Sequence, residues 1–200
     1  MRKVLIATAL LFVAVLTGCS QEKAKITTYM QALEASNAQM KGIAKDMEAS
    51  MSGLQDEIQG GKFDAEAVKT KIVGFSDKMK AEKSNLEGME VPEKAKVLHD
   101  LVVNQYQTAI EVLAETGPMI DMAKIMTDAT KMVKDDPSKG KEVMAKMQAT
   151  GAEIQAVQTK VGELAKKGQE FEMKAREEQK RLAEEFGIEI KNEEGVPAAK

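Results

Sequence analysis

The chain has very few of the residues that build disulfide, metal or aromatic sites. Its 200 residues include one cysteine, one histidine, two tyrosines, four prolines and no tryptophan. Because Cys19 is alone, no intrachain disulfide can form, and a folded domain must depend on its core. A single histidine, His99, also excludes paired-histidine zinc motifs and the two Glu-x-x-His pairs of a di-iron bundle.

Common catalytic motifs are missing as well. The sequence contains no H-E-x-x-H, G-x-S-x-G or C-x-x-C segment and no glycine-rich phosphate loop after a strand. His99 lies between Leu98 and Asp100 in a helical pattern, which favours a surface or rim histidine over a metal ligand. We therefore expect a protein that is not an enzyme and binds no separate cofactor.

The charge balance argues against nucleic acid as a partner. The chain has 29 basic and 32 acidic residues, a formal net charge of −3, and no run of more than two consecutive Lys or Arg residues. Phosphate binding needs a concentrated basic patch, and this sequence offers none.

The N-terminus has the three parts of a secretion signal. Arg2 and Lys3 give a positive start, residues 4–16 are uncharged, and Thr17-Gly18-Cys19 ends in small residues. The apolar run of about thirteen residues would span roughly 20 Å as a helix, whereas a bilayer core is ~30 Å thick. A cleaved signal is therefore favoured over a permanent membrane-spanning anchor.

Leu16-Thr17-Gly18-Cys19 resembles the lipobox of bacterial lipoproteins. The resemblance covers only about the first twenty residues. It implies that residues 1–18 are removed and that Cys19 carries a covalent lipid, which would be the only cofactor. Ser20 after that cysteine is similar to lipoproteins sorted to the outer membrane, so the resemblance implies the periplasmic face of that membrane in a cell with two membranes. Without Arg2 and Lys3, the remaining chain has a net charge near −5.

Heptad spacing of apolar residues predicts long helices after the signal. Three stripes follow alternating steps of four and three residues, which is typical of helices that wrap around one another. They are Ile26, Met30, Leu33, Asn37, Met40, Ala44, Met47, Met51, Leu54 and Ile58; Val68, Ile72, Phe75, Met79, Glu82 and Leu86; and Val143, Met147, Thr150, Ile154, Val157, Val161, Leu164, Gly168, Phe171, Ala175, Glu178 and Leu182.

Capping residues predict where these helices begin and end. We expect Gly60-Gly61 to end the first helix and Asp64 to cap the second, with Phe63 and Val68 as a hydrophobic staple. Further boundaries are expected from single residues. These are an end at Gly88, a start with Pro92 at the first helical position, a capped start at Asp136-Pro137, and a Schellman stop at Gly187 with Ile188 folding back.

The third segment has a broader apolar face and an interruption. Its face comprises Leu98, Leu101, Val102, Ala109, Ile110 and Leu113, and a second run comprises Met119, Met122, Met126, Ala129 and Val133. Gly117-Pro118 lies between the two runs and should kink or break the helix. We predict an all-α, elongated up-and-down bundle of four long helices, the third kinked. The expected organisation is a signal at 1–18, a lipidated N-terminus and short linker at 19–23, the bundle at 24–187 and a loose tail at 188–200.

Seven glycines fall inside the predicted helices, where each costs up to ~1 kcal/mol against alanine. They are Gly42, Gly53, Gly74, Gly140, Gly151, Gly162 and Gly168. Gly140, Gly151 and Gly162 are eleven residues apart, a period found in helices that lie on lipid. We favour close contact between helices together with chance over contact with lipid, because the heptad stripe explains more positions.

Two ligand-binding hypotheses remain open. Thioether sulfurs suit Cu(I), and Met119, Met122 and Met126 share one predicted face, although methionine is also an adaptable core residue. Alternatively, flexible methionines and the break at Pro118 could open a pocket for an apolar ligand or lipid.

The leading hypothesis is a non-catalytic binding or spacer module tethered to the membrane by lipid. A protein partner in the cell envelope could dock on the charged face of the last helix, in which case Glu178 would face that partner.

Overall fold

The computed structural model describes residues 2–189; for residues 2–19, 137, 146, 147, 149 and 152 it describes the backbone alone. The described chain forms helices and turns, without strands. The elements are α1 (Arg2–Met51), α2 (Leu54–Gln59), α3 (Ala65–Glu87), the 3-10 helix η1 (Glu93–Ala95), α4 (Lys96–Ala114), α5 (Gly117–Asp135), the 3-10 helix η2 (Pro137–Lys139) and α6 (Gly140–Phe186). Most of the predicted tail lies outside the described residues.

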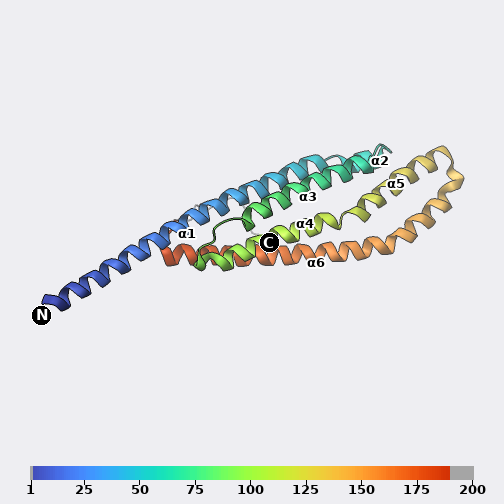
Figure 1. Cartoon of the computed structure of the whole chain (residues 1–200). Helices are drawn as coiled ribbons and strands as arrows, with labels where there is room; N and C mark the ends of the chain where they lie inside the picture. The colour runs from blue at the N-terminus through green and yellow to red at the C-terminus, as the bar shows by residue number, and fades with distance from the viewer. Residues whose placement is uncertain (1, 190–200) are drawn as a thin grey trace.

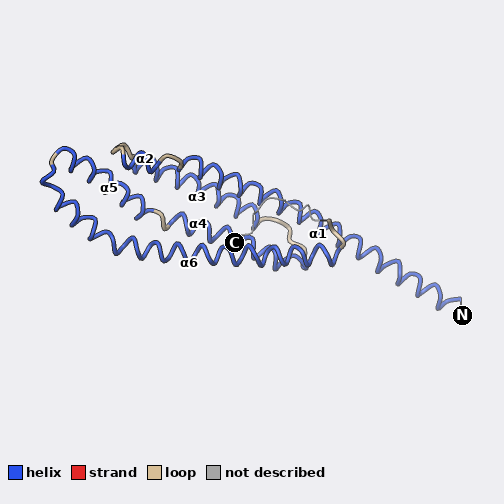
Figure 2. The backbone as a smooth tube through the Cα atoms, turned by 180° about the vertical axis from the view of Figure 1, so that it is seen from behind, coloured by secondary structure: helices blue, strands red, loops and turns tan. Residues whose placement is uncertain are grey.

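The helices run up and down an elongated bundle (Figures 1 and 2). α1 leads to one end, α3 returns, α4 and α5 run out again, and α6 returns over 47 residues, or about 70 Å. We call the end with residues 20–26, 87–96 and 182–189 the proximal end. The opposite end, with residues 51–64 and 135–142, is the distal end. The predicted elongated up-and-down bundle is confirmed.

The helices are not equally enclosed. α4 packs extensively on α6 and α3, and α5 packs on α6, whereas α1 packs mainly on α3 and touches α6 at few positions. The bundle is therefore more open between α1 and α6. Within the described part of the chain, no helix combines the length and apolarity needed to cross a bilayer.

The first helix ends earlier than predicted. α1 stops at Met51, and Gly53 follows with φ +86°, a left-handed conformation that glycine adopts at little cost. The predicted stripe through Leu54 and Ile58 therefore belongs to the separate helix α2, which ends at the expected Gly60. A stripe of apolar residues does not reveal this break, because the short helix keeps its apolar side toward the core.

Several predicted caps are confirmed. Asp64 Oδ1 accepts hydrogen bonds from the backbone nitrogens of Glu66 and Ala67, at 3.1 and 3.0 Å, and α3 ends at Gly88. Phe63 and Val68 share one buried cluster, as expected of a staple. The prediction that Pro92 occupies the first position of the third long helix was wrong. Pro92 precedes the 3-10 helix η1, and α4 begins only at Lys96.

The later boundaries follow the prediction at Gly117-Pro118 and Gly187. The capped start predicted at Asp136-Pro137 was wrong, because the 3-10 helix η2 follows Asp136 and α6 begins only at Gly140. The expected interruption at Gly117-Pro118 is a full break between α4 and α5, with the proline in the first turn of α5. Asp136 Oδ1 accepts hydrogen bonds from the backbone nitrogen and hydroxyl of Ser138. These bonds hold the pKa of Asp136 below its ordinary value. Gly187 has φ +57°, and the Ile188 nitrogen donates to the Ala183 oxygen at 2.8 Å, which completes the Schellman stop.

The core consists of three clusters along the rod. The proximal cluster joins α1, α3, α4 and α6 around Ile26, Leu86, Tyr106 and Leu182, all with 0% exposure. The middle cluster joins α1, α3 and α4, and the distal cluster joins α2, α3, α5 and the residues around them. Of these three clusters, only the proximal cluster contains buried side chains from α6.

Two predicted core faces need correction. In α1, Ile43 is buried and Ala44 is exposed, so the core face has moved by one residue. In α5, Ile120, Thr127 and Ala129 are buried, whereas Met119, Met126 and Val133 are 39–41% exposed. The methionine-rich face of α5 is thus a surface, and only Ala129 of the predicted run is in the core.

Candidate functional site

The proximal end begins where the lipobox resemblance ends. The backbone of Cys19 lies within α1, and residues 20–23 continue the same helix with exposed side chains. Lys23 Nζ donates a 2.9 Å hydrogen bond to the Gly187 oxygen, which ties this turn to the end of α6. Ile26, three residues later, is fully buried. The predicted linker at 19–23 is therefore helical, and it leads directly into the core.

Two polar contacts join α1 and α4 at the same register. Tyr29 Oη and His99 Nδ1 share a 3.0 Å hydrogen bond, and Ser36 and Tyr106 form the second contact. Each pair is separated by 70 residues, so the contacts lie one heptad apart on both helices. This spacing requires α1 and α4 to run parallel and fixes their axial alignment.

The Tyr106 contact is fully buried. Tyr106 Oη donates to the Ser36 backbone oxygen at 2.8 Å and lies 2.9 Å from Ser36 Oγ, so both hydroxyls are satisfied. Burial raises the pKa of Tyr106. Sequence reasoning missed this pair, because a tyrosine and a serine do not stand out in an apolar stripe.

The single histidine has a structural partner. His99 is half-buried at the rim, as predicted, and its ring lies 6.1 Å from the Tyr29 ring, centroid to centroid. Burial, and secondarily the charge of Asp100, raise the pKa of Tyr29, so its hydroxyl stays protonated. The pair can align helices through a hydrogen bond, but it does not provide a deprotonated oxygen for catalysis.

Four charged residues link α6 to η1 at the proximal end. Arg181 donates to both Glu178 oxygens, from Nη2 at 2.7 Å and Nε at 2.9 Å, and also pairs with Glu185. Lys94 Nζ donates to Glu185 Oε1 at 3.2 Å. Glu178 thus has a partner on its own helix, and its side chain is only 16% exposed.

Replacing Glu178 with glutamine should weaken the acid sensitivity of folding. The hydrogen bond from Arg181 holds the pKa of Glu178 below its ordinary value. A lowered folded-state pKa adds stability that is fully present above the ordinary glutamate pKa of 4.5, and this stability is lost as pH falls below that value and through the folded-state pKa. Because Arg181 is 46% exposed, we expect about 1 kcal/mol or less. Urea unfolding at pH 7 and pH 3.5 measures the difference.

Glu177→Gln is the matched control, because Glu177 is an exposed neighbour on the same helix. The Glu178→Gln variant should lose less stability than the wild type between the two pH values, and the Glu177→Gln variant should follow the wild type. Equal losses in all three proteins would contradict the assigned role of the Arg181 hydrogen bond.

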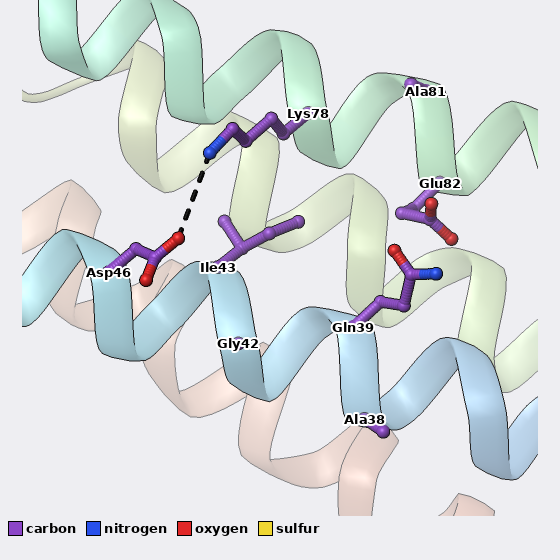
Figure 3. A pocket seen from close by; sticks show the side chains of 8 residues that line it. All are labelled: Ala38, Gln39, Gly42, Ile43, Asp46, Lys78, Ala81 and Glu82. Carbon is purple, nitrogen blue, oxygen red and sulfur yellow. Dashed lines mark ion pairs between the residues drawn. The ribbon is translucent and has the colours of Figure 1, made fainter.

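A groove of about 660 Å³ lies between α1 and α3 and is open to solvent (Figure 3). At one end Lys78 Nζ lies 3.8 Å from Asp46 Oδ2, and at the other Gln39 and Glu82 point toward each other. Its other lining residues are Ala38, Gly42, Ile43 and Ala81. Sites for apolar ligands enclose most of the ligand in apolar walls, and this open, mixed lining does not. The groove lends no support to the carrier hypothesis.

The methionines occupy two different environments. Met30 and Met79 are buried, and Met40, Met47 and Met51 pack against the core. The Cu(I) candidates lie on the outer face of α5, where Met119 and Met126 are each 41% exposed and Met122 is half-buried. The alternative interpretation of these methionines as core residues is therefore wrong for Met119 and Met126.

Most of the helical glycines do not mark close helix contacts. A Cβ added at Gly42, Gly74, Gly140, Gly151 or Gly162 would meet no heavy atom within 4 Å beyond its own helix. Only Gly168 has a close neighbour from another helix, Thr108 Cγ2 at 3.6 Å. Close helix contact, which was favoured together with chance, therefore applies to Gly168 and not to Gly140, Gly151 or Gly162. The three glycines spaced by eleven residues have open space beside them.

The described residues hold no group of three or more His, Cys, Asp or Glu side chains that could bind a metal ion. The arrangement at the proximal end is one of helix alignment and ion pairing. Comparison of the chain with protein-family models, curated proteins and solved structures found no match.

Proposed function

We propose that this chain is a lipid-anchored rod of the bacterial cell envelope that acts by binding or spacing and not by catalysis. The single observation that supports this most is the helical continuity at its start. Residues 20–23 are helical, Lys23 contacts Gly187, and Ile26 is completely buried. A lipid on Cys19 would therefore hold the whole rod by its proximal end, with no flexible linker between.

The distal end of such a rod would lie farther from the membrane than any part of a compact anchored domain. In Figure 1 the hairpin of α5 and α6 reaches beyond α2. It exposes Met119, Met126, Val133 and Met144 by 39–63%. Flexible, exposed methionines suit contacts with varied apolar surfaces. The proposed role is to hold this hairpin away from the membrane, on the periplasmic face of the outer membrane in a cell with two membranes.

Fluorescence transfer to a membrane dye tests this geometry. The lipidated full chain, purified from bacterial membranes and reconstituted in vesicles, would carry a donor at Glu90→Cys or at Lys139→Cys. Both residues are exposed, Glu90 at the proximal end and Lys139 at the distal end. We expect strong transfer to a headgroup acceptor from Glu90→Cys and weak transfer from Lys139→Cys. Equal transfer from the two sites would show a rod lying flat and would contradict the spacer role.

A further inference from the structure

α6 carries a second regular face besides the one that packs on α4 and α5. Steps of four and three residues from Met144 reach Gln148, Gly151, Gln155, Gln158 and Gly162. The same steps continue to Ala165 and Gln169, where the regular spacing ends because the next three-residue step reaches Glu172; Met173 lies one turn after Gln169. We call these nine residues the uncharged α6 face. Its heptad spacing is the pattern by which one helix packs along another.

This face is not covered by the rest of the chain. Met144 is 63% exposed and Met173 is 58% exposed, so both ends present large apolar side chains to solvent. Between them Gly162 is half-exposed, and the other residues are exposed. No heavy atom from another helix lies within 4 Å of a Cβ added at Gly151 or Gly162. A neighbouring helix could approach closely at these two glycines without displacing any side chain of this chain.

The face stands out by its charge. α6 is rich in Lys, Arg and Glu, yet the nine residues include none of them. At about 100° per residue they occupy an arc of about 100° over roughly eight turns. Between residues 144 and 173 the charged side chain within this arc is Lys166, at its edge, and beyond Met173 the same arc continues to Arg176 and Lys180. A solvated helix face would carry charge as readily as its neighbours do, so the scarcity of charge between residues 144 and 173 indicates a contact over this part of α6.

We propose that the uncharged α6 face binds the same face of a second copy of this chain, with the two α6 helices parallel. In a parallel pair, each residue near the twofold axis lies opposite its own copy, so any charge there would face a like charge. An antiparallel pair can set a charge opposite its complement and has no need for an uncharged face. The direction also fits the proposed function, on which it rests, because both proximal ends would meet one membrane.

The first test uses two glycines with open surroundings. Gly151→Lys places a charge on the uncharged α6 face, and Gly74→Lys places the same charge on α3, outside it. Neither added side chain meets a heavy atom within 4 Å, and lysine favours helix more than glycine, so both variants should fold. Sedimentation of the full chain in mild detergent should give a dimer for the wild type and Gly74→Lys. Gly151→Lys should raise the dissociation constant at least tenfold.

A wild-type monomer at micromolar concentration would overturn the proposal, as would equal dissociation constants for the two lysine variants. Sedimentation in detergent does not depend on membrane attachment. A chain that leaves the membrane but still forms dimers would therefore count against the anchor alone, and an anchored monomer would count against the dimer alone.

Disulfide trapping tests the direction. Gln148→Cys should form a covalent dimer with itself, whereas Ala156→Cys, an exposed residue on another side of α6, should form at least tenfold less. All chains keep Cys19, so the unmodified protein gives the background. Mixed Gln148→Cys and Gln169→Cys chains would link to each other only in an antiparallel pair. That link, without Gln148→Cys self-linkage, would overturn parallel pairing.

Discussion

The Cys19→Ala variant is expected to move the protein almost completely from the membrane fraction to the soluble fraction. Acyl chains contribute about 0.8 kcal/mol of membrane binding per buried CH₂, and two or more chains make attachment stable. Without the thiol no lipid can be transferred. The remaining apolar run of about thirteen residues is too short to anchor the chain across a bilayer ~30 Å thick. Ultracentrifugation of cell lysates, followed by immunoblotting, measures the distribution.

Two further variants make this prediction decisive. Ser20→Ala keeps the cysteine and should remain with the membrane. Replacing residues 1–19 with the signal of a soluble secreted protein removes both the thiol and the apolar run, and should give a soluble, folded bundle. Helix content by circular dichroism should match the wild type, because Ile26 is the first buried residue among those whose side chains the structure describes, from Ser20 onward. Membrane retention of the replaced chain would contradict lipid anchoring.

Much of the fold could be predicted because its signals are local. Asp64, Gly88 and Gly187 each act on the few residues around them, and the structure places the predicted helix ends at all three. Heptad spacing likewise reports a helix whatever its neighbours are. The class of fold and the order of its long helices therefore followed from the sequence.

Which face is buried is not a local property. On a straight α-helix Ala44 lies in phase with Ile26, because 18 residues make five turns, and Ile43 lies about 100° away. Burial of Ile43 in place of Ala44 therefore depends on where α3 and α4 pack, which the spacing within α1 does not report. In α5 the methionine stripe and the neighbouring Ile120–Thr127 face have similar periodicity, and only the position of the other helices decides between them.

The polar contacts between α1 and α4 show the same limit. Ser36 and Tyr106 form hydrogen bonds with each other across the bundle, and the sequence around either residue does not identify its partner. The shared separation of 70 residues is visible only once both contacts are known. Lipidation at Cys19 is the opposite case, because its signal is entirely in the sequence, and it remains a prediction.

Leu182→Ala should cost about 2–5 kcal/mol of unfolding free energy, the largest loss we expect from one side chain. Leu182 has 0% exposure and lies in the proximal cluster, the one that unites α1, α3, α4 and α6. Truncation would leave a cavity there that the four helices cannot easily close. Leu164→Ala is the matched control, because Leu164 is a half-exposed leucine on the same helix and should cost clearly less. Urea unfolding followed by circular dichroism measures both.

The position of the residues that lose protection from hydrogen exchange distinguishes this local effect from a general loss of helix. Because α1 has few contacts with α6 outside the proximal end, loss of Leu182 should loosen the first turns of α1 before the distal hairpin. Amide hydrogen exchange should therefore rise more around Ile26–Leu33 than around Ile120–Ala129. A uniform rise along the rod would mean that the three clusters unfold as one unit. A confined rise would mean that the proximal cluster alone connects the predicted membrane anchor to the rest of the bundle.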